Sequence, residues 1–304
     1  MKRVELLSGI NLNVISDEKF KTNSVSINFI TPLTKEDVTV NAILPNLLEK
    51  GYDGCSDFIE FNHKLEELYG ASAQSFIQKV GDYQIVTIYA TAIDDKFTLN
   101  KESITNELCS IVCKMAFNPI FKDGMFLEKE VELEKQTLCD IISSEINDKG
   151  TYAILKGISE MCSDEPYGIY KNGFIDKAKE ITAKSATEAY KNLVKKSRIE
   201  IMFVGCGNPQ EEIFKNAVSQ LDRQYIQLAP ISMHIKSQKE EIVNRMNVNQ
   251  AKLFMGMGSD LKNNDSATKI MATILGGSPT SKFFVNVREK LSLCYFVNSG
   301  SEAN

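Results

Sequence analysis

The stretch that decides the fold runs from Leu275 to Ser299 and reads LGGSPTSKFFVNVREKLSLCYFVNS. Two adjacent glycines end a preceding apolar helical run, and the Ser-Pro-Thr-Ser segment that follows offers side chains able to cap a new helix. Apolar residues then recur at helical spacing up to Leu291, and aromatic and β-branched residues follow, as is typical of a buried strand. The pattern predicts a short helix that carries Arg288 and a buried strand that carries Tyr295, close enough in sequence to line one site.

The same stretch resembles the second-half signature of the M16 (pitrilysin/insulinase-like) zinc metallopeptidases. The resemblance rests on the Leu-Gly-Gly at 275–277, on Ser281-x-x-Phe284, and on Arg-Glu-Lys-x-x-Leu-x-Tyr at 288–295. In that family this arginine and tyrosine form an R/Y pair that holds the substrate peptide opposite the zinc, which implies that role for Arg288 and Tyr295. Where the family often has a glycine at the helix end, this chain has Ser292, which tolerates a left-handed cap less well. Without the resemblance, Arg288 is expected to cap the helix and Tyr295 to lie in the core.

Length and composition describe an ordinary globular protein. The 304 residues allow about two domains, and the net charge of −5 argues against nucleic acid as a partner. No apolar run approaches the roughly 20 residues that a membrane span requires. Seven cysteines at irregular spacing favour reduced thiols and a cytoplasmic location over a disulfide framework.

Hydrophobic periodicity divides the chain into two series of strands and helices. In the first series, strands are predicted over 3–31, 72–79, 83–93 and 199–207, and helices over 36–50, 56–68, 98–116, 122–148, 151–161, 183–195 and 209–221. A strand over 251–259 and a helix over 267–275 begin the second series. The order of elements in residues 24–79 recurs in residues 251–299, which predicts an internal repeat.

This repeat matches the architecture that the resemblance implies, which is an α+β fold of two homologous halves. Each half is expected to be a mixed or antiparallel sheet covered by helices. We place the first half at 1–223, and the linker with the start of the second half at 224–304. The second sheet is only beginning at Asn304, so the second half is expected to be truncated.

The resemblance also implies where a zinc site would lie in the first half. Active M16 peptidases carry H-x-x-E-H on the first helix, in which two histidines bind zinc and the glutamate activates water. The motif position falls on Ala42-Ile43-Leu44-Pro45-Asn46, so both histidines and the general base are replaced. A third ligand from the later long helix is expected near Asp140 or Ile141. We therefore expect a degenerate zinc motif at Ala42, Pro45 and Asn46, no metal and no cofactor in this chain, and zinc only in a partner subunit.

Other candidate sites are weaker. Glu60, His63 and Glu67 share one helical face, but a solvated polar face explains them better than a metal site. His234 stands alone, Cys109 and Cys113 are read as buried thiols, and Gly205-Cys206-Gly207 lacks the rest of a dinucleotide-binding fingerprint. The acidic residues between 127 and 135 are read as solvated helix surface.

These observations together predict a non-catalytic subunit of a heterodimeric M16-type peptidase. The resemblance is to the M16B branch, in a YfmF-like subgroup linked to modification of elongation factor P. The partners implied are a catalytic M16 subunit that carries the zinc and a peptide or protein substrate. One alternative is a purely structural M16-fold protein without a peptidase partner, and another is an independent peptidase with a different metal site.

Overall fold

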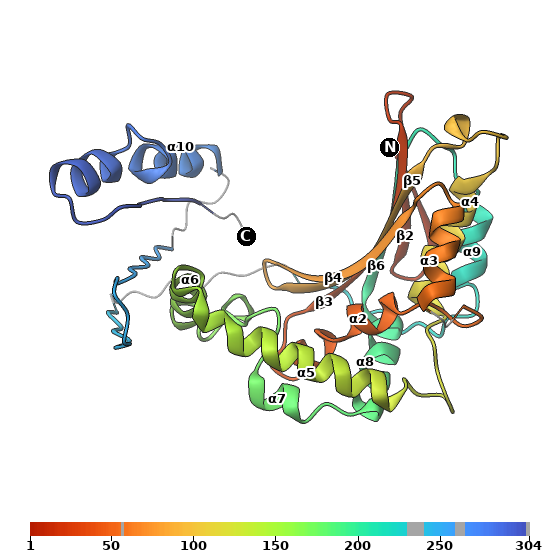
Figure 1. The fold of residues 1–304 in the computed structure, drawn as a ribbon, viewed down its shortest axis with the longest axis horizontal. Coiled ribbons are helices and arrows are strands. Elements are labelled where there is room, and N and C mark those ends of the chain that lie inside the picture. The colour runs from red at the N-terminus through yellow and green to blue at the C-terminus, as the bar shows by residue number, and fades with distance from the viewer. Residues whose placement is uncertain (56–57, 230–239, 259–264, 302–304) are drawn as a thin grey trace. The chain divides into compact units, whose positions relative to one another are not determined.

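A computed structural model describes residues 1–55, 58–229, 240–258 and 265–301. The chain divides into two compact units, the first Met1–Ile231 with Met246–Met255 and the second Ser232–Arg245 with Gly256–Asn304. Figure 1 follows the chain through both. In the described residues no helix is both long enough and apolar enough to cross a membrane. The two homologous halves predicted at 1–223 and 224–304 stay a prediction.

The first unit is built on a six-stranded sheet with the strand order β1-β2-β6-β3-β5-β4. The strands are β1 (Lys2–Leu7), β2 (Ile10–Ser16), β3 (Thr22–Pro32), β4 (Ser72–Val80), β5 (Tyr83–Ile93) and β6 (Arg198–Gly205). Only the β2–β6 pair is parallel among these neighbours, and the other four pairs are antiparallel. The predicted mixed sheet is thus confirmed, and β4 forms one of its edges.

Helices gather on one face of this sheet (Figure 1). The α-helices are α1 (Val38–Asn41), α2 (Leu44–Glu49), α3 (Phe58–Glu67), α4 (Ile104–Phe117), α5 (Glu128–Ser144), α6 (Lys149–Met161), α7 (Ile175–Lys179), α8 (Ala183–Lys196) and α9 (Glu211–Val218). Three short 3-10 helices are η1 (Asp95–Phe97), η2 (Glu145–Asn147) and η3 (Pro166–Gly168). The helix predicted over 36–50 is two helices, and α7 was not predicted because its five residues are too few to show a period.

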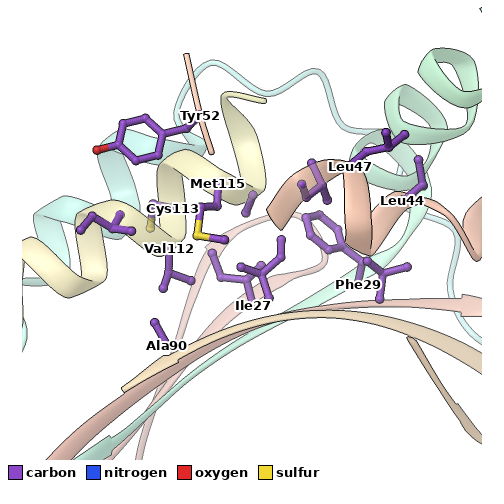
Figure 2. Packing of buried hydrophobic residues seen from close by; sticks show 14 of the residues in the cluster. Ile27, Phe29, Leu44, Leu47, Tyr52, Ala90, Val112, Cys113 and Met115 are labelled. Carbon is purple, nitrogen blue, oxygen red and sulfur yellow. The ribbon is translucent and has the colours of Figure 1, made fainter. Parts of the chain in front are cut away.

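The core lies between the helices and the inward face of the sheet. On β3, the side chains of Val25, Ile27 and Phe29 are fully buried, because alternate residues of a strand point to the same face. Figure 2 shows Ile27 and Phe29 pointing toward the helical layer, where Leu44 and Val112 are among the helix residues of the same cluster. Burying each large apolar side chain stabilises the fold by roughly 1.5–3 kcal/mol, so this interface is the main source of stability in the first unit.

The opposite face of the sheet carries polar side chains joined by hydrogen bonds. Glu200 on β6 accepts from Asn13 Nδ2 at 2.7 Å, from Arg198 Nε at 2.7 Å and from Arg3 Nη2 at 2.8 Å. Burial acts to raise the pKa of Glu200, but these three donors outweigh it and hold the pKa below its usual value of 4.5. The network therefore contains a carboxylate that stays charged below neutral pH.

In the described residues after 245, the structure contains helices where they were predicted but lacks the predicted strands. The described helices are α10 (Asp265–Gly276) and the π-helix η4 (Phe284–Lys290). Residues 251–258 and 293–297 form no strand, and Leu253 and Tyr295 are 88% and 85% exposed. Both strand predictions are wrong for this structure, because apolar alternation makes a strand only where a neighbouring strand satisfies the backbone groups.

Candidate functional site

Asn46 lies on α2 and faces the buried carboxylate of Glu134 on α5. The Asn46 Nδ2 donates to Glu134 Oε2 at 2.7 Å, and the Lys50 ammonium lies 2.7 Å from Glu134 Oε1. Glu130, one turn earlier on α5, lies 3.4 Å from the same ammonium. Only 6% of Glu134 is exposed, so its charge depends on these donors and not on water.

Lys50 supplies the positive charge of this cluster. Burial acts to lower its pKa, but the hydrogen bond and charge of Glu134, together with Glu130, outweigh burial and hold the pKa above its usual value. Lys50 therefore remains an ammonium at neutral pH and supplies the counter-charge to Glu134.

The residues at this position do not fit a catalytic zinc. Ala42 has no ligand atom, Pro45 has no side-chain base, and the Asn46 amide already donates to Glu134. A zinc site in proteins takes imidazole, thiolate or carboxylate ligands, and a catalytic site has three of them. Of these ligand types the cluster contains only the carboxylates of Glu130 and Glu134. The buried one, Glu134, is already paired with the Lys50 ammonium.

The third ligand expected near Asp140 or Ile141 stays a prediction. Asp140 is exposed and accepts from Gln136 Nε2 at 3.0 Å, whereas Glu134 is the acid that reaches Asn46. The interpretation of Glu134 as solvated helix surface is therefore wrong. Its spacing from Val131 and Leu138, both buried on α5, was the signal in the sequence, because residues three and four apart share a helix face.

A pocket of about 240 Å³ opens beside this cluster, between β4, α2 and α5. Its lining includes the side chains of Ala42, Pro45, Asn46, Phe76, Glu134 and Ile141. Ser75 on β4 fixes one wall, because its hydroxyl donates to the Pro45 carbonyl at 2.7 Å and its backbone N–H donates to Glu49 Oε2 at 2.9 Å. The three positions of the degenerate motif thus border a single cavity in the first unit.

Pro45 lies in the first turn of α2, not inside a longer helix. The α-helix is interrupted at two residues, Ala42 and Ile43. Ala42 is the C-cap of α1 and Ile43 is the N-cap of α2. Proline is well tolerated in a first helical turn, because the N–H that it lacks would have no partner in the helix there. The proline therefore marks a helix start.

In the second unit, Arg288 and Tyr295 are both exposed. The Arg288 guanidinium carbon lies 4.4 Å from the centre of the Phe284 ring, which is a cation–π arrangement within η4. Tyr295 is 85% exposed, so it is not a core residue in this structure. Within the described part of the second unit, no hydrogen bond or ring contact joins the two side chains.

Ser292 lies between them and adopts the left-handed conformation, with φ of 51°. The N–H of Leu293 donates to the Val287 carbonyl at 3.0 Å and closes the end of η4. The backbone thus turns at the position where the resemblance implied a glycine.

The remaining candidates show no assembled site. His63 Nδ1 lies 3.3 Å from Glu66, and both side chains are largely exposed. Burial raises the pKa of the Cys113 thiol to about 12, and that of Cys109 further, so both are inert thiols as expected. His234 lies outside the described residues. Across those residues, no group of three or more His, Cys, Asp or Glu side chains is arranged to hold a metal ion.

Comparison with known proteins gives a family model, a curated relative and solved structures that resemble this chain. Residues 180–304 match the family model described as the Peptidase M16 inactive domain. The chain is 28% identical over 306 residues to the Bacillus subtilis protein named probable inactive metalloprotease YmfF, covering 97% of this chain and 70% of that one. The relative carries the name YmfF and not the name YfmF of the expected subgroup.

Two crystal structures share the fold. A conserved protein from Enterococcus faecalis V583 has a TM-score of 0.87 at 27% identity, over 98% of this chain and 71% of that one. A peptidase M16 inactive domain from Pseudomonas fluorescens has a TM-score of 0.66 at 16% identity, over 99% of this chain and 70% of that one. In sequence and in fold the chain is therefore similar to inactive members of the M16 metallopeptidase family.

Proposed function

We propose that this chain is the non-catalytic subunit of a heterodimeric, cytoplasmic M16-type zinc peptidase. In this proposal the partner chain carries the zinc, and this chain completes the chamber in which the peptide is bound. The observation that carries the proposal is the Lys50 ammonium on Glu134, next to Ala42, Pro45 and Asn46. A site neutralised by its own lysine has no use for a metal, so any peptidase chemistry must come from another chain.

The exposed Arg288 and Tyr295 are the residues that would act on the partner's substrate. An arginine offers a fixed fork of donors for a peptide carbonyl or carboxylate. A tyrosine hydroxyl can donate to the scissile carbonyl or to the oxyanion that forms from it, where such a donor is worth a few kcal/mol. The exposure of Tyr295 supports this role over the core role that an isolated reading of the sequence favours.

The test is reconstitution with an H-x-x-E-H chain from the same organism. Each chain is purified alone and together with the other, and zinc content and peptide cleavage are measured. We expect one zinc per pair, bound by the partner, and cleavage by the pair but not by this chain alone. Elongation factor P and peptides from it are the first substrates to try.

Two outcomes would support other functions. If no H-x-x-E-H chain binds to this chain, it is a structural M16-fold protein. If the isolated chain binds one zinc and loses it when His63 is replaced by Ala, it is a peptidase with a different metal site.

A further inference from the structure

Cys206 follows the last residue of β6 and lies beside a lysine from a distant part of the first unit. The Lys96 Nζ donates to the Cys206 Sγ at 2.7 Å, although the two residues are 110 positions apart. The Cys206 side chain is partly exposed and that of Lys96 is exposed, so small molecules in solvent can reach both. Gly205-Cys206-Gly207 therefore presents a nucleophilic sulfur next to an amine.

The buried side chain of Asn23 fixes the backbone on both sides of Cys206. The Gly207 N–H donates to Asn23 Oδ1 at 2.9 Å. A Cβ on Gly205 would clash with Asn23 Oδ1, and one on Gly207 would lie 2.8 Å from Asn23 Nδ2. Both neighbours of Cys206 are therefore glycines because Asn23 occupies the space beside them, and the turn that carries the thiol is held in place.

Asn23 also fixes the segment of Lys96, through Asp94. Asn23 Nδ2 donates to Asp94 Oδ2 at 2.8 Å, and Asp94 Oδ1 accepts from the Lys96 backbone N–H at 3.2 Å as the N-cap of η1. The Lys96 ammonium lies 5.2 Å from the centre of the Phe97 ring. The backbones of Lys96 and Cys206 are thus anchored to one buried side chain, and groups held together in this way react at a high effective concentration.

The ammonium and the sulfur also influence each other electrostatically. A neighbouring ammonium stabilises a thiolate, which is the form of cysteine that reacts with peroxides. The hydrogen bond to Cys206 raises the pKa of Lys96 above its usual value of 10.5, and the charges of Asp94 and Glu18 add to this effect. Lys96 therefore holds a proton beside the sulfur that can be transferred once the thiolate has reacted.

We propose that Lys96 and Cys206 form a peroxide-sensitive switch, in which oxidation joins Nζ to Sγ in a sulfenamide bond. The Cys206 thiolate attacks one oxygen of hydrogen peroxide, the O–O bond breaks, and the departing hydroxide takes a proton from Lys96 to give water. The Lys96 amine then attacks the sulfur of the sulfenic acid, an N–S bond forms, and the sulfenic hydroxyl leaves with an amine proton as a second water. A thiol reverses the link, because its attack on Sγ releases the amine and leaves a mixed disulfide that a second thiol reduces.

The link fastens two strands of the sheet across a third. Strands β6 and β5 lie on either side of β3. At this end of the sheet, Thr22 of β3 pairs with Ile93 of β5. Ser24 of β3 pairs with Val204 of β6. The sulfenamide therefore bridges the start of β3, and the oxidised chain should melt at a higher temperature because a cross-link restricts the unfolded chain.

Peptide mapping of the full chain after treatment with a small excess of hydrogen peroxide tests the switch. We expect residues 80–101 and 199–215 to appear as one tryptic species, lighter than the two peptides together by two hydrogen atoms. Trypsin should no longer cut after Lys96, because the linked nitrogen has lost its positive charge. Dithiothreitol should separate the two peptides and restore this cleavage.

Two variants and a second thiol serve as controls. Lys96→Met should give no linked species, and dimedone should then trap Cys206 as the sulfenic acid, formed several-fold more slowly than the link forms in the parent. Lys19→Met, which removes an exposed lysine paired with Asp17, should link as the parent does. Cys139, also partly buried, should react more slowly than Cys206 in the parent. The proposal is overturned if trypsin still cuts after Lys96 in parent chain whose Cys206 is oxidised, or if Cys206 stays reduced while Cys139 reacts.

Discussion

Glu134 is a buried carboxylate held by two donors. The amide of Asn46 and the ammonium of Lys50 each lie 2.7 Å from one of its oxygens. A buried carboxylate without a counter-charge is costly. Lys50, the C-cap residue of α2, supplies the counter-charge to Glu134.

Replacing Lys50 should expose this dependence. We expect Lys50→Met to lower the free energy of unfolding by about 1–3 kcal/mol, because a hydrogen-bonded charge loses its partner. Adding Glu134→Gln should recover part of the loss, since the remaining group is neutral. Urea unfolding measures the free energy of unfolding of both variants. The control is Lys177→Met, which breaks the exposed Lys177–Glu180 pair and should change this free energy by no more than about 0.5 kcal/mol. Equal effects at Lys50 and Lys177 would contradict the account.

Among the elements, α2 is a short helix that begins at its proline. Ser75 binds the Pro45 carbonyl, and Glu49 binds the backbone of β4, so α2 is fixed to the edge of the sheet at both ends. Ala42, just before α2, and Asn46 within it both line the same pocket.

For Pro45→Ala we expect a loss of stability of about 0.4–1 kcal/mol. A proline whose backbone angle already suits the first turn stabilises by restricting the unfolded chain. Thermal unfolding measures the change, and Pro166→Ala at the start of η3 is the matched control, with a similar loss. If Pro45→Ala instead gained stability by about 3 kcal/mol, the cost of a proline inside a helix, Pro45 would interrupt a continuous helix.

At the other end of the chain, Ser292→Gly should tighten the end of η4. The left-handed conformation costs a residue with a Cβ about 1–2 kcal/mol, and glycine avoids this cost. Amide exchange of Leu293, whose N–H closes the helix end, should slow several-fold, whereas Ser292→Ala should give no such protection. Faster exchange in the glycine variant would mean that the serine side chain itself holds the turn.

For the whole molecule, stability should depend on pH through Glu200, which joins β1, β2 and β6. Its pKa is lowered in the folded state, so its contribution is complete above the unfolded value near 4.5 and is lost as pH falls through the folded value. The melting temperature of Glu200→Gln should therefore lie below that of the parent at pH 7. The difference should shrink below pH 4.5, and a difference that grows there would refute the role.

Much of the first unit could be predicted from its sequence. Strands such as β6 alternate strictly in burial, and helices such as α8 follow a 3.6-residue period, because both pack one face on a common core. Glu134 was missed because its partner lies 88 residues away, and no local pattern reports a contact made by folding. The strands at 251–259 and 293–297 failed for the same reason, since a strand depends on its neighbour.

The most direct test of the proposed function is turnover by the reconstituted pair carrying Tyr295→Phe. This substitution removes the hydroxyl and keeps the ring, so this chain stays folded and able to bind its partner. We expect kcat to fall by about tenfold to a thousandfold, because an oxyanion donor is lost. Arg288→Ala should instead raise KM, since it removes a charge-assisted contact to the bound peptide. Full activity of a pair that carries both substitutions would show that this chain is a scaffold and that Arg288 and Tyr295 do not serve the site.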